Sequence, residues 1–173
     1  SGSVASGASL EASILYWGGS VNQTGSACSS SADDEVTLTF PDGTSSSITA
    51  DRCYCADGGA SSYDIWVCKS DVTSTHTAAG GDLTGTFTIS DYTGKWSGGS
   101  TDTASASLVE VYSDTSLPPR RVVLFDGNIT LRYTSELISL TGFDVDTTPA
   151  GDLTFYTMEG DVGGGGTEQV RLQ

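Results

Sequence analysis

The sequence predicts an all-β fold, an antiparallel β-sandwich of the jelly-roll kind with about ten short strands. Three observations lead to this prediction. Polar and apolar residues alternate with a period of two in many segments, which is typical of strands with one buried face. Turn residues separate these segments at the spacing found in sandwiches. Helix signals are confined to residues 71–79.

The clearest strand signal is at residues 35–40, where Val36, Leu38 and Phe40 alternate with polar residues. The turn after it is expected because proline presets φ and glycine accepts a positive φ. By the same criteria, strands are expected at residues 10–17, 35–40, 47–55, 64–68, 84–90, 104–112, 122–125, 129–133, 137–143 and 153–158.

Two of these segments carry a more specific expectation. Residues 122–125 form a continuous apolar run, as in a strand that is covered on both faces. Asp126 and Gly127 then predict a tight turn into the strand at 129–133, so that the two strands form a hairpin.

The predicted helical segment is short. Asp71 could cap one or two turns that end before Gly80 and Gly81. Threonine is a poor helix former, so we expect no more than a 3₁₀ turn or a short α-helix here.

Length and charge limit the possible functions. The chain has 173 residues, enough for one domain, and its formal net charge is −15. Phosphate backbones and anionic membranes attract clusters of Lys and Arg, so we expect neither nucleic acid nor a membrane surface as a partner. No segment has the roughly 20 apolar residues that cross a bilayer, so we expect no membrane insertion.

The two ends of the chain differ from its middle. Residues 1–9 lack a basic region and an apolar region, so we expect any signal peptide to have been removed already. These residues are predicted to be a flexible segment or a donor strand, and residues 10–162 a β-sandwich domain. Residues 163–173 are predicted to be a glycine-rich linker followed by a terminal strand.

The cysteines indicate an oxidising compartment. Four cysteines in a chain poor in lysine predict two disulfides and a secreted protein; they are Cys28, Cys53, Cys55 and Cys68. The spacing of Cys53 and Cys55 is too tight for the pairs that bind structural zinc, and no Cys-x-x-Cys redox motif occurs. We favour one bridge from Cys68 to the 53–55 segment and one that tethers Cys28.

No catalytic constellation stands out. His76 is the only histidine, and the Gly-x-Ser-x-Gly motif is absent. We interpret His76 as exposed or adjacent to a helix cap. The acidic residues show no pattern that would mark a pair of glycosidase carboxylates.

Calcium is the one cofactor for which the sequence offers candidate ligands. Asp144, Asp146 and Asp152 lie in one loop, and hard cations bind such clusters of oxygen atoms. Pro149 stands where an EF-hand loop needs glycine, and no glutamate closes the loop. A solvated acidic turn is therefore the favoured interpretation, with calcium as the alternative.

Two further kinds of site are considered. Asn22 and Asn128 match the N-glycosylation motif, although Asn128 also suits the predicted hairpin turn. Trp96 lies in a glycine-rich segment and is the best candidate for an aromatic side chain that stacks on a sugar or a protein, with packing under a loop as the alternative.

Several short segments in the same order resemble a family of uncharacterised bacterial and archaeal extracellular domains of unknown function, the DUF3344-like group. The resemblance covers the chain from about residue 10 to its end; it includes residues 12–20, 48–52, 69–73, 85–90, 108–114, 119–127 and 158–161. It implies a secreted β-sandwich on the cell surface and brings no catalytic residues. Relatives continue beyond residue 173, and the cysteines are not part of the pattern.

These observations together predict a non-enzymatic extracellular protein. We expect a structural or adhesive subunit of a surface layer, pilus or fibre that associates with itself or with other surface proteins. The terminal segments at 4–10 and 167–172 are expected to donate a strand to a neighbour. The alternative is a carbohydrate-binding module that uses Trp96 and binds glycans, with or without calcium.

Overall fold

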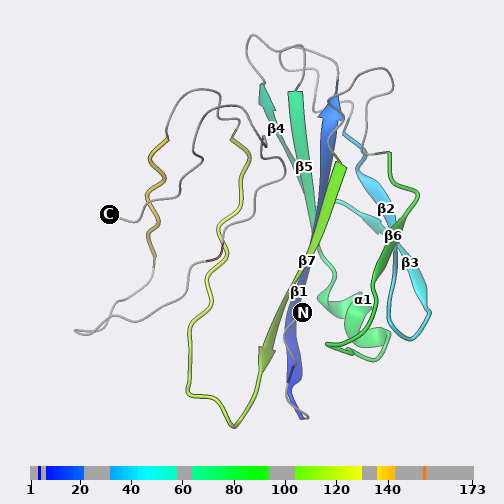
Figure 1. Cartoon of the computed structure of the whole chain (residues 1–173), viewed down its shortest axis with the longest axis vertical. Coiled ribbons are helices and arrows are strands. Elements are labelled where there is room, and N and C mark those ends of the chain that lie inside the picture. The colour runs from blue at the N-terminus through cyan, green and yellow to red at the C-terminus, as the bar shows by residue number, and fades with distance from the viewer. Residues whose placement is uncertain are drawn as a thin grey trace, which may run out of the picture.

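The computed structural model describes residues 4, 7–21, 32–57, 64–93, 104–129, 136–142 and 154. These residues form two antiparallel β-sheets and one short helix, so the prediction of a mainly β protein is confirmed. Figure 1 shows the two sheets side by side, with the helix at one end of the space between them.

The larger sheet, sheet A, has the strand order β4-β5-β1-β7. Its members are β4 (Arg52–Asp57), β5 (Asp64–Asp71), β1 (Ser9–Val21) and β7 (Ala104–Ser113). β1 pairs with β5 on one side and with β7 on the other, so that Trp17 lies opposite both Cys68 and Ala106. A bulge between Leu10 and Ala12 interrupts the pairing of β1 with β7.

The smaller sheet, sheet B, has the order β3-β2-β6, with β2 (Glu35–Thr39), β3 (Ser45–Thr49) and β6 (Thr88–Ser90). β2 and β3 form a hairpin, joined by the turn that the sequence predicts after residue 40. Gly43 adopts φ 87° in its turn, and its N–H donates to the carbonyl of Phe40 at 2.9 Å. A positive φ at this position is the reason that glycine is needed there.

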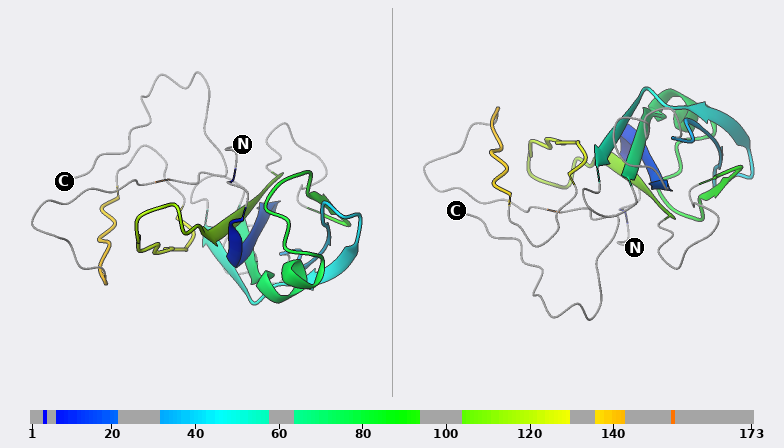
Figure 2. Two further views of the ribbon diagram at one scale, coloured as in Figure 1. Left: turned by 90° about the horizontal axis from the view of Figure 1, so that it is seen from below. Right: turned by 90° about the horizontal axis from the view of Figure 1, so that it is seen from above.

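The two sheets share one hydrophobic core. Alternate residues of β1 and β5 from sheet A pack against alternate residues of β2 and β3 from sheet B. Figure 2 shows the two sheets facing each other, seen from below and from above. The buried core residues are Leu15, Trp17, Val36, Leu38, Phe40, Ile48, Trp66, Cys68 and Val72. Trp17 and Trp66 are each 1% exposed, as expected for tryptophans between sheets.

The predicted strand at 47–55 is two strands, because the chain changes sheets in its middle. The N–H of Ala50 donates to Asp34 beside sheet B at 2.8 Å, and the N–H of Asp51 donates to Lys69 of sheet A at 2.9 Å. The prediction of one continuous strand was therefore wrong. Alternation of polar and apolar residues does not reveal which neighbouring strand each residue pairs with.

Three other predicted strands fall within described residues and differ from the expectation. The segment at 84–90 contributes only β6, residues 122–125 form no strand, and the described part of the segment at 137–143, residues 137–142, forms none either. An apolar run becomes a strand only where a neighbour supplies hydrogen bonds, and these runs have no such ladder among the described residues. The count of ten strands is not confirmed. The predicted strands at 129–133 and 153–158 lie outside the described residues, except for Ile129 and Thr154.

The predicted helical turn is confirmed as α1 (Thr73–Ala78). Val72 occupies the N-cap position without a side-chain cap bond. Asp71, which we expected to be the cap, lies one residue earlier. Its Oδ1 accepts hydrogen bonds from the Thr73 N–H at 3.0 Å and the Thr73 hydroxyl at 2.5 Å.

Candidate functional site

A buried polar cluster lies where α1 packs against sheet A. Its members are His76 of α1, Ser13 of β1 and Glu110 of β7; His76 and Ser13 have no exposed surface. Ser13 and Glu110 lie directly opposite each other in the pairing of β1 with β7. Paired residues of neighbouring strands share a face of the sheet, so both side chains lie on the face that α1 covers.

The start of α1 is fastened to β1 by backbone groups. The N–H of Val72 donates to the carbonyl of Ser13 at 2.9 Å, and the N–H of Ser13 donates to the Thr73 hydroxyl at 2.9 Å. These hydrogen bonds extend the pairing along β1 by one residue, to Ser13, beyond the end of β5. They place His76, one turn further along α1, over Ser13.

Both ring nitrogens of His76 have polar neighbours. Nε2 lies 3.0 Å from the backbone carbonyl of Asp82, which can only accept, so we assign the proton to Nε2. Nδ1 then accepts from the Ser13 hydroxyl at 3.2 Å. Glu110 Oε1 lies 3.6 Å from the same Nδ1 and has no hydrogen-bond partner.

Aromatic rings that flank sheet B enclose the His76 ring: Phe40 directly follows β2, and Phe87 directly precedes β6. Phe40 stacks on the ring with centroids 5.3 Å apart, and Phe87 meets it edge-on at 5.2 Å. His76 therefore contacts both sheets. The expectation that it is exposed was wrong, because α1 is too short for its sequence to show which side faces the core. The alternative, a histidine adjacent to a helix cap, fits, since His76 lies in the last turn and its carbonyl accepts the N–H of the C-cap residue Ala79 at 3.1 Å.

This geometry does not suit nucleophilic catalysis by Ser13. In a serine–histidine–acid triad the serine and the acid contact different ring nitrogens. Here Ser13 and Glu110 both approach Nδ1, and a backbone carbonyl occupies Nε2. Because the Ser13 hydroxyl is also fully buried, the arrangement fits a role in packing.

Glu110 is the least satisfied member of the cluster. Burial raises the pKa of its carboxyl, and the nearby His76 only partly offsets this. A carboxyl whose pKa is higher in the folded protein stabilises the fold below its unfolded pKa, and this contribution is lost as the pH rises through its folded pKa. Ionised Glu110 therefore destabilises the protein at neutral pH.

We expect Glu110→Gln to raise the free energy of unfolding at pH 7 by roughly 1 kcal/mol, because it removes the charge of a partly buried carboxylate whose buried Oε1 has no hydrogen-bond partner. The gain over the wild type should shrink as the pH falls towards the ordinary pKa of glutamate. Denaturant unfolding between pH 4 and pH 8 measures this difference.

The exposed Glu136 supplies the matched control, Glu136→Gln, which should shift stability little at any pH. A Glu110→Gln variant that is less stable than the wild type at pH 7 would show that the carboxylate is needed.

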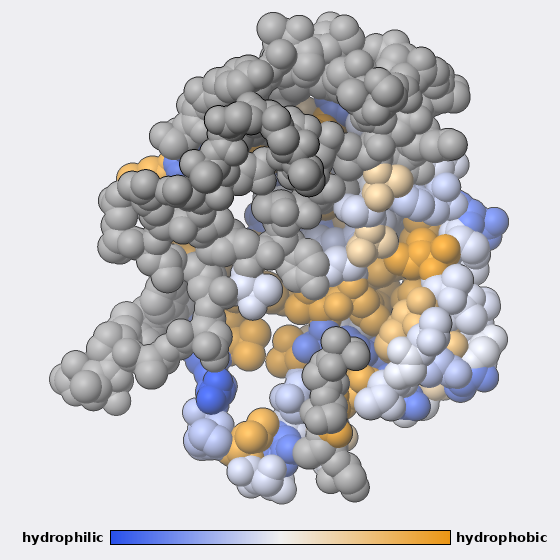
Figure 3. Space-filling model, in the orientation of Figure 1, coloured by the Kyte–Doolittle hydropathy of each residue, from blue (hydrophilic) through white to orange (hydrophobic). Residues whose placement is uncertain are grey.

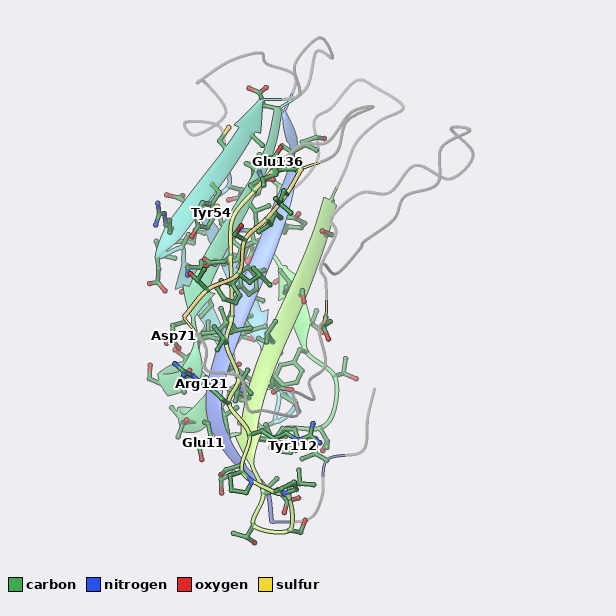
Figure 4. All side chains as sticks on the ribbon, turned by 90° about the vertical axis from the view of Figure 1, so that its left-hand side faces the viewer. Glu11, Tyr54, Asp71, Tyr112, Arg121 and Glu136 are labelled. Atoms are coloured by element: carbon green, nitrogen blue, oxygen red, sulfur yellow. A yellow bond between two sulfur atoms is a disulfide. The ribbon has the colours of Figure 1, made fainter. Side chains whose placement is uncertain are left out.

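A second candidate site lies on the opposite face of sheet A. After β7 the chain turns and runs back over this outer face as residues 117–129, which we call the strap (Figure 4). Asp126 Oδ2 lies 2.6 Å from Lys69 Nζ and accepts a hydrogen bond from the Tyr54 hydroxyl at 2.7 Å. The side-chain N–H of Asn128 donates to the carbonyl of Ile65 at 2.7 Å. The far end of the strap is thus anchored to β4 and β5.

The contacts of Asp126 with Lys69 and Tyr54, which we call the anchor, favour the charged forms of Asp126 and Lys69. Burial alone would raise the pKa of Asp126, but the hydrogen bonds from Lys69 and Tyr54 outweigh this effect and lower it. The same contact with Asp126 raises the pKa of Lys69. The guanidinium of Arg52 lies over the Tyr54 ring, 4.8 Å from its centroid. The pair is therefore charged at neutral pH.

The middle of the strap exposes apolar side chains. Val122, Val123, Leu124 and Phe125 are 59%, 39%, 43% and 49% exposed. These residues were expected to form a strand covered on both faces, and that expectation was wrong. Figure 3 shows apolar and charged surface adjoining in the lower part of the molecule, where the chain turns from β7 into the strap.

The predicted cysteine pairing is confirmed for one bridge. Cys53 of β4 and Cys68 of β5 lie directly opposite each other and form a disulfide. Cys55 is also disulfide-bonded, and no described cysteine is free. Cys28 lies outside the described residues.

The other predicted sites are mostly outside the part of the chain that the structure describes. This holds for Trp96, for Asn22 and for the loop with Asp144, Asp146 and Asp152. Asn128 is described, and its amide nitrogen, the atom that would carry a glycan, already bonds to Ile65.

Both sites were missed by reasoning from the sequence. The buried cluster joins residues far apart in the chain, so only the strand pairing could reveal it. The strap did leave a signal, because a continuous apolar run beside Arg120 and Arg121 is unusual in so acidic a chain.

The described residues contain neither a metal-binding cluster nor a membrane-spanning helix. They contain no group of three or more His, Cys, Asp or Glu side chains that could hold a metal ion. No helix among them is long and apolar enough to span a bilayer.

Comparison with known proteins identifies no relative of this chain. No protein-family model matches the sequence, and no curated protein or solved structure matches it. The resemblance to extracellular surface domains therefore stays a prediction.

Proposed function

We infer that the chain is a non-enzymatic extracellular module, a structural or adhesive subunit of a cell-surface layer, pilus or fibre. Its two sheets are the layers of a β-sandwich in this proposal. The formal charge of −15 and the disulfide between Cys53 and Cys68 are typical of secreted domains that remain soluble and stable outside the cell.

One observation carries the proposal: the strap exposes four consecutive apolar side chains, at 122–125. Contiguous exposed apolar surface on a soluble protein is typical of sites that contact another protein. Arg120 and Arg121 are exposed directly before this run and would attract an acidic surface, which every copy of this chain offers. The proposal is therefore that copies associate through the strap.

The N-terminal segment is a weaker candidate for the contact. β1 begins at Ser9, and Leu10 already pairs with Tyr112 of β7. Part of the expected donor segment is thus used within its own sheet. The segment at 167–172 lies outside the described residues.

We expect Leu124→Ser/Phe125→Ser to weaken self-association by tenfold or more. The two side chains are about half exposed, so covering them at an interface contributes roughly 2 kcal/mol. Sedimentation velocity over a range of protein concentrations measures the change, and circular dichroism confirms that the variant is folded.

Leu137 and Ile138 supply the matched control, since they are exposed apolar neighbours outside the strap, at 76% and 57%. Leu137→Ser/Ile138→Ser should leave association unchanged. A wild-type protein that remains monomeric throughout the concentration range would refute the proposed function.

A further inference from the structure

We propose that the strap docks on the outer face of sheet A of a second copy, which places its own strap on the first copy in return. This inference rests on the proposed function and names the surface that receives the strap. The partner is a second copy of this chain.

The receiving surface carries apolar side chains beside the polar groups that bind the strap. Residues of sheet A that alternate with the core residues point to the outer face, and on the three strands β1, β5 and β7 they include Ile14, Tyr16, Val67 and Val109. All four are only partly buried. Tyr16 pairs with Lys69 and Val67 pairs with Tyr54, so these side chains lie beside the groups that bind Asp126 of a strap.

The contacts between the strap and this face are side-chain contacts, and they do not require the strap and the sheet to belong to the same chain. Lys69 and Tyr54 bind Asp126, and the Ile65 carbonyl binds Asn128. All three bonds lie at the far end of the strap, and each joins a strap side chain to the body of the domain. The same bonds form whether the strap belongs to the same copy or to a second one.

The near end of the strap is a small local turn that can serve as a hinge. Leu117 N–H donates to the carbonyl of Asp114 at 3.0 Å, and the carboxylate of Asp114 accepts bonds from the N–H and hydroxyl of Ser116. Pro118 and Pro119 follow directly and favour an extended chain. Opening this exposed turn redirects the strap without breaking a strand.

A second copy can cover apolar side chains that stay exposed when the strap lies on its own body. In the single chain the side chains at 122–125 remain 39–59% exposed although the anchor is formed. A neighbouring body brings additional surface to cover them.

Charge reversal at the anchor tests the exchange. In Lys69→Glu the anchor residues are both negative, and in Asp126→Lys they are both positive, so neither variant can seat a strap on its own body or on an identical copy. In an equimolar mixture each strap finds an opposite charge on the other variant. The double variant, Lys69→Glu/Asp126→Lys, restores attraction and serves as the control for folding.

We expect each single variant to be monomeric, the mixture to give a heterodimer by native mass spectrometry, and the double variant to associate like the wild type. A mixture without heterodimer, beside a wild type that does associate, overturns this inference and leaves the proposed function standing. Single variants that associate as well as the wild type also overturn it. A wild type that does not associate overturns both.

A second measurement needs no variant. Carbodiimide joins a lysine to a carboxylate in contact, so it should link Lys69 to Asp126 in the wild type. In a mixture of ¹⁴N- and ¹⁵N-labelled protein, the linked peptides should include pairs of one light and one heavy chain. Linked peptides with both halves from one label only would show that the strap stays on its own body.

Discussion

Replacing His76 by alanine should lower the free energy of unfolding by about 3–5 kcal/mol, as for other large buried rings. The ring is fully buried between Phe40 and Phe87, so its loss leaves a cavity. It also leaves the buried Ser13 hydroxyl without its nitrogen acceptor. Denaturant unfolding at pH 7 measures the loss.

A second substitution separates packing from hydrogen bonding at this position. His76→Phe keeps a ring of similar size but makes neither polar contact, so it should cost less than alanine, about 1–3 kcal/mol. The control is Thr77→Ala on the exposed side of α1, which should change stability by no more than about 0.5 kcal/mol. A loss below about 1 kcal/mol for His76→Ala would mean that the cluster contributes little.

Removing the disulfide between Cys53 and Cys68 should have an effect of similar size. The bridge closes a loop with a sequence separation of 15, for which the restriction of the unfolded chain corresponds to roughly 3 kcal/mol. Cys68 is also fully buried in the core. We therefore expect Cys53→Ala/Cys68→Ala to lose about 3 kcal/mol or more, seen as a lower midpoint in thermal and denaturant unfolding.

Both cysteines have to be replaced together, because a single remaining thiol could exchange with the disulfide of Cys55. Mass spectrometry under non-reducing conditions confirms that the other bridge is intact. If the double variant unfolds at the wild-type midpoint, the register of β4 and β5 is held by their hydrogen bonds and packing alone.

The local sequence predicted those strands that have one apolar face and one polar face. Val36, Leu38 and Phe40 alternate with polar residues in the sequence and are buried in the structure. The same reasoning located β1, β5 and β7, and it placed Cys53 near Cys68 because two neighbouring strands were expected there. In each case the information lies within a few residues of the chain.

Features set by distant partners were not predictable in this way. The burial of His76 depends on β1 and β7, which bring Ser13 and Glu110 together. The change of sheet between Ala50 and Asp51 depends on Asp34 and Lys69. The apolar run in the strap reads like a strand, but a strand needs a hydrogen-bonded neighbour, and no local pattern shows whether one exists.

The pairing of β1 with β7 also bears on how the protein reaches its native state. Ser9 pairs with Ser113 and Gly19 with Ala104, so the first strand waits for one of the last described strands to be synthesised. Pairings between residues so far apart in the sequence are associated with slow folding. A nascent chain that has not yet reached residue 104 exposes one long edge of β1, and it is in this interval that the protein is most open to mispairing.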